Sequence, residues 1–111
     1  MREERGTING DVVVYEEFTL WGTIIGAVKV IDGGKFYVRG NIHGDMDVEP
    51  GGRVHIFGRV SGKVKLARGT KVIHSGMITG DVINDGGRFF ADQGAMIGGK
   101  VRTHAGETRL L

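Results

Sequence analysis

Residues 40–57 read GNIHGDMDVEPGGRVHIF, and residues 58–75 read GRVSGKVKLARGTKVIHS, with glycines and apolar residues at matching places. The same spacing, a period of about 18 residues, continues in both directions along the chain. It generates two rows of glycine, namely Gly22, Gly40, Gly58, Gly76 and Gly94, and Gly26, Gly44, Gly62, Gly80 and Gly98. Similarity at a fixed period over nearly the whole chain is the signature of a repeat architecture.

Inside each repeat, single apolar residues alternate with polar ones, and one apolar row is Ile24, Ile42, Val60, Ile78 and Met96. Alternation with period two is typical of strands with one buried face, and no 3.6-residue stripe indicates a helix. Three short strands joined by glycine corners bring the chain back to its start about 4.8 Å further along. We therefore predict an all-β chain that forms a triangular parallel β-solenoid, with about 18 residues per coil and five to six coils.

Departures from the period lie near the ends of the chain. Gly10 and Gly26 are closer together than the period, so the first coil is two residues short. The pair Gly86-Gly87 comes one residue early, and GAMIGGKV at 94–101 gains a glycine. We expect modified end coils. The predicted organisation is a charged N-terminal tail at 1–6, the β-solenoid domain at 7–103 and a C-terminal tail at 104–111.

The composition narrows the possible functions. The chain has 15 basic and 13 acidic residues, and a net charge of +2 is too small by itself to indicate nucleic acid. Without cysteine there is no disulfide or thiolate metal site, which fits a reducing cytosol. The opening MREERGTING has no apolar core of a signal peptide, and no apolar run is long enough for a spanning helix.

The repeat alone leaves the handedness of the solenoid open. Apolar residues such as Ile24, Val30 and Phe36 also recur every six residues, as in the left-handed hexapeptide helices of acyltransferases. The residues that follow such positions, for example Ile25 and His43, are usually neither small nor acidic, which disfavours that pattern. An acyltransferase-like trimer with an interface histidine is one alternative.

Three segments carry a resemblance to a known family: TINGDVVVYEEFTLWGTIIGAV at 7–28, GRVSGKVKLARGTKV at 58–72 and GAMIGGKV at 94–101. In their order and spacing they resemble the bactofilins, a bacterial family of polymer-forming cytoskeletal proteins. The resemblance spans roughly residues 7–103. It implies a right-handed parallel β-helix that assembles end to end into filaments without bound nucleotide.

The resemblance also implies partners and a location. The expected partner is the chain itself, with an anionic membrane or cell-wall enzymes as further partners and no nucleic acid. The expected location is the cytoplasm, with a peripheral position at the inner face of the cell membrane as an extension. The longer proline-rich tails and the membrane-targeting N-terminal segment of the family have no counterpart in this sequence.

No constellation in the sequence indicates catalysis. No phosphate-binding loop of the Walker type is present. His43 and His55 are expected outside and solvated, and His74 falls at an apolar position inside the column or at its edge. Asp45 and Asp47 are expected to point outward beside lysines, which favours ion pairing over a catalytic role. We expect no enzyme activity, no cofactor and no metal.

Stacking coils of equal length predicts rows of charge on the outside. Lys29, Asp47 and Lys65 alternate in sign, and so do Asp45, Lys63 and Asp81, an arrangement that opposes slippage between coils. One row does not alternate. We call it the basic row, and it consists of Lys35, Arg53, Lys71 and Arg88. The basic row has two interpretations. It is a binding site for anionic lipid, wall polymer or an acidic partner, or it is a solvated corner whose long lysine and arginine side chains cover apolar surface.

The ends of an open solenoid expose unpaired backbone groups and a cross-section of the apolar column. Soluble solenoids usually need polar capping repeats, and both ends of this sequence are apolar. The predicted polymer interface is Ile8, Val12, Val14, Phe18, Leu20, Trp21, Met96, Ile97, Val101, Leu110 and Leu111. Ile97 is expected outside the column, facing a neighbouring subunit.

The predicted function is therefore a non-enzymatic scaffold that self-assembles end to end. A second alternative is a dimeric adaptor that resembles the C-terminal β-helical domain of the Min-system division inhibitor. The only support for this alternative is a weak similarity between VRTHAG at 101–106 and the C-terminal segment of that domain.

Overall fold

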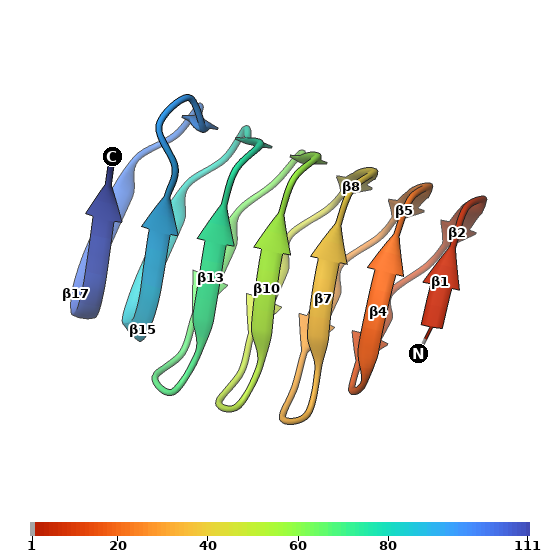
Figure 1. The fold of residues 1–111 in the computed structure, drawn as a ribbon, viewed down its shortest axis with the longest axis horizontal. Coiled ribbons are helices and arrows are strands. Elements are labelled where there is room, and N and C mark those ends of the chain that lie inside the picture. Colours follow the sequence, from red (N-terminus) through yellow and green to blue (C-terminus); the bar gives the residue numbers. More distant parts are fainter. Residues whose placement is uncertain (1) are drawn as a thin grey trace.

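The computed structural model describes residues 2–111 and contains 17 strands and no helix in that range. Every strand pair there is parallel, and each strand pairs with the equivalent strand of the coil before or after it. The chain winds through about six turns, with the N-terminus at one end of the longest axis and the C-terminus at the other (Figure 1). The predicted all-β parallel solenoid is confirmed. Residues 2–111 contain no helix that could cross a membrane.

The strands form three stacks. The first contains β1 (Arg2–Glu4), β4 (Glu17–Leu20), β7 (Lys35–Val38), β10 (Arg53–Ile56) and β13 (Lys71–His74). The second contains β2 (Thr7–Asn9), β5 (Thr23–Ile25), β8 (Asn41–His43), β11 (Arg59–Val60), β14 (Met77–Ile78) and β16 (Met96–Ile97). The third contains β3 (Val12–Val14), β6 (Val28–Val30), β9 (Met46–Val48) and β12 (Val64–Leu66). Two long strands, β15 (Val82–Ala91) and β17 (Val101–Leu110), run from the third stack around a corner into the first.

The pairing register follows the predicted period, including its departures. Ile24 pairs with Ile42, one full period later, and the next two coils keep this spacing. Ile8 pairs with Ile24 at a shorter interval, as the short first coil requires. Val72 pairs with Phe89 one place early, because the corner before Phe89 is one residue shorter. The last coil is one residue longer than the period, so Ile78 pairs with Ile97 one place late.

The corner glycines are needed mainly because successive coils approach closely there. A Cβ on Gly40 would lie 1.9 Å from the carbonyl oxygen of Gly22 and 2.6 Å from that of Trp21. These are backbone atoms that cannot swing away, so no larger residue fits. The corner between the third and the first stack differs, because Gly33 and Gly51 there have φ of 86° and 87°. These values lie in the left-handed region that favours glycine.

The interior is a continuous column of apolar side chains. Phe18 and Phe36 stack with ring centroids 5.3 Å apart. The fully buried large side chains are Phe18, Phe36, Phe89, Leu20, Ile24, Ile42, Met46, Ile56, Leu66, Ile78, His74 and Val14. Each coil contacts mainly its two neighbours, so the column is thin but unbroken.

The strands extend into both segments that we assigned to tails. Within 1–6, β1 pairs with β4, and within 104–111, β17 pairs with β15 as far as Leu110. The sequence pattern ends earlier because the inward positions there carry polar groups. Arg2 pairs with Phe18 and holds its guanidinium carbon 4.5 Å from the centre of that ring. Ladder hydrogen bonds use only the backbone, so they continue where the apolar alternation stops.

Candidate functional site: the two ends and the basic row

At the N-terminal end, most of the residues predicted for a polymer interface are part of the core. Val12, Val14, Phe18 and Leu20 are 0–6% exposed within a single chain. Their side chains offer almost no surface to a second subunit, so the prediction of an apolar contact through these side chains is wrong. For Phe18 and Leu20 the physical reason is that β1 pairs with β4 and closes the column over them. Val12 and Val14 point into the column from β3, whose outer backbone edge stays open. Ile8 is half-buried and packs against the core at this end.

Trp21 is exposed, but it lies on a side corner of the solenoid. The guanidinium carbons of Arg5 and Arg39 lie 5.0 and 5.2 Å from the centre of its ring, and Arg39 also covers Phe57 at 4.2 Å. The indole Nε1 donates to a carboxylate oxygen of Glu3. This alternation of guanidinium and aromatic rings links the coils at the N-terminal end along one edge.

The C-terminal end is apolar and more open. Met96, Leu110 and Leu111 are 62%, 59% and 77% exposed, while Ile97 and Val101 are partly buried against the core. Our expectation that Ile97 lies outside the column is wrong. The extra residue in the last coil moves Ile97 into the inward row next to Ile78 and turns Met96 outward next to Met77.

Strand edges are open at both ends. In the sheet formed by the second stack, β2 and β16 are the terminal strands. In the larger sheet, β1 and β3 are terminal, and within residues 2–111 β17 pairs only with β15. Each end therefore presents a layer of backbone donors and acceptors for a further coil, which is the kind of edge that natural proteins normally cover.

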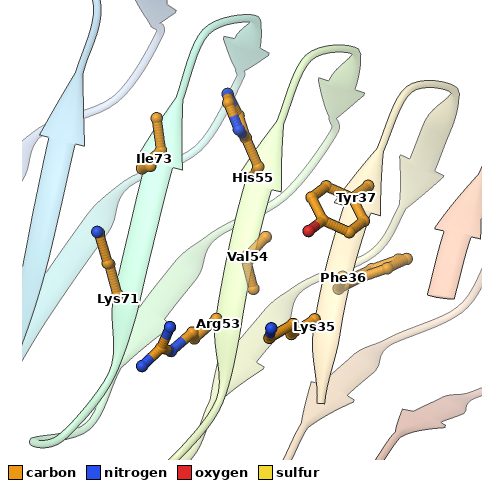
Figure 2. A pocket seen from close by; sticks show the side chains of 8 residues that line it. All are labelled: Lys35, Phe36, Tyr37, Arg53, Val54, His55, Lys71 and Ile73. Carbon is orange, nitrogen blue, oxygen red and sulfur yellow. The ribbon is translucent and has the colours of Figure 1, made fainter. Parts of the chain in front are cut away.

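The basic row is confirmed as a row. Lys35 pairs with Arg53, Arg53 with Lys71, and Lys71 with Arg88. The first three lie side by side on adjacent strands and point away from the core (Figure 2). Within residues 2–111 none of the four forms an ion pair. Beside the row lies a groove of about 210 Å³, whose other lining residues are Tyr37, His55, Ile73, Phe36 and Val54.

The alternating charge rows have the predicted register but different contacts. Asp47 lies between Lys29 and Lys65, yet Lys29 reaches Glu49 instead, with 3.8 Å between Nζ and Oε1. In the other row the carboxylates accept backbone N–H groups. Asp45 accepts from the amide of Lys63, and Asp81 from that of Lys100, both at 2.8 Å. The carboxylates therefore fix the corner of the next coil rather than pairing with lysine ammonium groups.

His55, Ser75 and Asp92 form a chain of hydrogen bonds on the outside of the first stack. The hydroxyl of Ser75 donates to Asp92, and Nε2 of His55 lies 3.1 Å from that hydroxyl oxygen. Because the serine proton goes to Asp92, His55 must donate to the serine oxygen and cannot take its proton. A nucleophilic triad needs the histidine between serine and carboxylate. Here the serine is in the middle, so the chain of bonds acts as a clamp between coils.

The two histidines of this region have lowered pKa values. Burial is the main cause of the lowered pKa of His55, whose ring stacks on Phe57, with Asp92 opposing the shift and Arg39 adding to it. His74 is fully buried in the inward row, and burial lowers its pKa against the opposing hydrogen bond to Met96 and the charge of Asp92. Its Nε2 donates to the carbonyl of Met96 at 2.8 Å. His43 is exposed, as expected.

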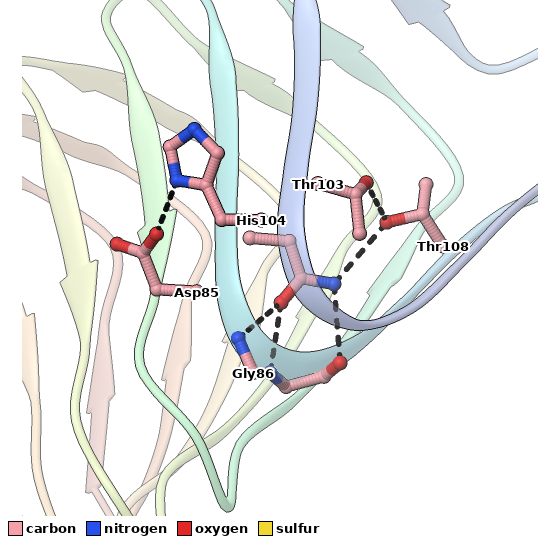
Figure 3. A network of polar contacts seen from close by, with 7 residues as sticks. Asp85, Gly86, Thr103, His104 and Thr108 are labelled. Atoms are coloured by element: carbon pink, nitrogen blue, oxygen red, sulfur yellow. Dashed lines mark hydrogen bonds and ion pairs between the residues drawn. The ribbon is translucent and has the colours of Figure 1, made fainter.

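A buried asparagine near the C-terminal end was not predicted from the sequence. Asn84 lies in the inward row next to Leu66, and its amide makes five hydrogen bonds. Figure 3 draws its bonds to Gly86 and Thr108. Its oxygen accepts from the amides of Gly86 and Gly87. Its nitrogen donates to the carbonyls of Gly87 and Glu107 and to the hydroxyl of Thr108. Asn84 thus fastens the shortened corner to β17.

Comparisons with models of protein families, with curated proteins and with solved structures found no match to this chain.

Proposed function

We propose that the chain is a non-enzymatic scaffold whose solenoids join end to end into filaments without nucleotide. The observation that carries the proposal is the open layer of strands at each end, with Met96, Leu110 and Leu111 exposed at the C-terminal end. A further coil from a second copy would pair the free backbone groups and cover these side chains. The resemblance of the sequence motifs to those of bactofilins supports the same conclusion.

The two ends differ in chemistry, which bears on how copies join. The C-terminal end offers the exposed apolar side chains named above, whereas the N-terminal end places Arg2 and Glu4 at inward positions beside the half-buried Ile8. Contact between two C-terminal ends buries more apolar surface than contact between two N-terminal ends. We therefore propose the C-terminal end as the stronger contact, with the N-terminal end completing the filament.

Two finer features of the solenoid belong to this proposal. The three stacks of strands per coil support a triangular cross-section. The right-handed winding is supported by the motifs shared with bactofilins. A cytoplasmic location, with attachment to the inner face of the cell membrane or to cell-wall enzymes, is proposed on the same resemblance.

The test replaces an exposed leucine at the proposed contact. Arginine at position 110 stays in water in a single chain, but an end-to-end contact buries it without a partner, which costs several kcal/mol. We expect Leu110→Arg to give folded monomers or single dimers by circular dichroism, sedimentation velocity and electron microscopy. The matched control is Ile25→Arg, because Ile25 is also exposed and apolar but lies on the side of the second coil.

Filaments from Leu110→Arg equal to those of the wild type, or equal disruption by Ile25→Arg, contradict the proposed contact. A closed trimer of the wild type instead favours an acyltransferase-like assembly, and a wild-type dimer that never polymerises favours a Min-type adaptor.

A further inference from the structure

The basic row lies beside a corner, at the first residues of β7, β10 and β13, and acidic residues follow it at both ends along the solenoid axis. Glu17 precedes Lys35 in the same register, and Glu107 follows Arg88. Adjacent strands lie about 4.8 Å apart, so the four cations extend over about 14 Å. Acidic residues at the limits confine the positive charge to four coils, which defines a site of fixed length.

The like charges inside the row have no compensation from ion pairs within residues 2–111. Like charges directly opposite each other on neighbouring strands are destabilising. The nearby Glu49 lies 3.8 Å from Lys29, on another face, and Glu107 pairs with Arg109. An anionic ligand along the row relieves this repulsion, and the planar guanidinium groups of Arg53 and Arg88 can each hold a carboxylate through two parallel hydrogen bonds.

The groove beside the row supplies surfaces of a second kind. Tyr37, His55 and Ile73 are half-buried and form a second row next to Lys35, Arg53 and Lys71 (Figure 2). The negative face of an aromatic ring attracts weakly positive C–H groups, and the phenol and imidazole offer hydrogen bonds to hydroxyl groups. The site thus combines one cation per coil with an apolar and hydrogen-bonding wall.

The cations and the groove wall together favour some classes of polyanionic ligand over others. A membrane is a plane, whereas the residues here line a groove and the rings of the second row are half-buried against the sheet. Single-stranded nucleic acid needs free ring faces for successive bases. However, His55 already stacks on Phe57 with centroids 3.8 Å apart, and Arg109 lies 6.0 Å from the ring of Phe90. Phe36 is buried in the core, which leaves Tyr37 as the ring that faces the groove, so successive bases have no row of free ring faces along the basic row.

We propose that the basic row and its groove bind an acidic polysaccharide, with one sugar carboxylate at each cation and a sugar ring against Tyr37. An extended chain of uronic acid sugars carries one carboxylate per ring, which matches one cation per coil. The site lies on the side of the solenoid, so it does not depend on the proposed end-to-end assembly.

The test measures binding of oligogalacturonates of two, four and eight sugars by isothermal titration calorimetry at low salt. We expect affinity to rise up to four sugars and then level off, and to fall as salt is added. Arg53→Gln with Lys71→Gln should weaken binding of the four-sugar chain about tenfold or more, since each removes a charge-assisted hydrogen bond. The control Lys63→Gln with Lys65→Gln changes the net charge equally on another face and should bind as the wild type does.

A second variant tests the closure of the site. Glu17→Gln removes the negative charge beside Lys35 and should strengthen binding, a gain that a purely structural role would not produce. Circular dichroism checks that every variant is folded. The proposal is overturned by equal weakening in the lysine control, or by equal binding of uncharged cello-oligosaccharides. Binding only to anionic vesicles or to oligothymidylate, or no binding at low salt, also overturns it.

Discussion

Replacing Asn84 with leucine should destabilise the protein, although it restores the apolar row occupied by Leu66 in the preceding coil. The change removes the acceptor at 3.1 and 2.8 Å from the amides of Gly86 and Gly87. It also removes the donor at 3.1 and 2.9 Å from the carbonyls of Gly87 and Glu107. An unsatisfied buried group costs about 1–3 kcal/mol, and half-buried groups recover part of this in water, so the gross loss is about 5 kcal/mol.

The leucine side chain gains about 2 kcal/mol from burial, which leaves a net loss of about 3 kcal/mol. Urea unfolding at two protein concentrations measures this loss and separates any contribution from assembly. Amide hydrogen exchange should show the largest loss of protection at the C-terminal end of β17, where Asn84 reaches Glu107 and Thr108. The conservative control Leu66→Met should cost less than about 1.5 kcal/mol. If Asn84→Leu is as stable as the wild type, the hydrogen-bonded corner does not hold the end coils.

Two further predictions concern the corners and the buried histidine. Gly40→Ala should lower the free energy of unfolding in urea by about 3 kcal/mol or more, because its Cβ would lie 1.9 Å from the carbonyl oxygen of Gly22. In the control Gly6→Ala the nearest atom is a side-chain oxygen at 3.5 Å, so its stability should stay within about 1 kcal/mol of the wild type. Similar losses for both variants would refute the argument from close approach. The lowered pKa of His74 means that the unfolded chain binds more protons than the folded chain at acidic pH. The contribution of His74 to folding stability is therefore complete above about pH 6.5 and is lost as the pH falls below that value. His74→Gln should therefore reduce the slope of stability against pH between about 6.5 and 5, and an unchanged slope would contradict this assignment.

The regular part of the fold could be predicted from the sequence because each inward residue is repeated in the next coil. Ile24, Ile42 and Val60 fall on one row by counting alone, and the basic row follows from the same count once the early corner before Arg88 is allowed for. Counting fails where a corner gains or loses a residue. The orientations of Met96 and Ile97 were exchanged in the prediction, because the added residue shifts both by one place.

Polar residues at inward positions also limited what could be predicted from the sequence. Arg2, Thr103 and Thr108 lie on strands that continue the solenoid, but their side chains carry no sign of an inward position. The role of Asn84 depends on a corner that only the folded backbone defines. The predicted interface residues Phe18 and Leu20 failed for a related reason, since β1 covers them with a strand that the pattern did not reveal.

The central claim is that copies join along the solenoid axis, and fibre diffraction from aligned filaments of the purified chain, grown without nucleotide, tests it most directly. In such filaments every strand lies across the axis, so the spacing between strands, about 4.8 Å, must appear along the axis. A subunit of about six coils should also give an axial repeat of about 30 Å or, for paired ends, twice that value. This agrees with the longest extent of the chain, 34 Å. Filaments with the strand spacing of about 4.8 Å across the axis, or no filaments under any nucleotide-free condition, would contradict the account.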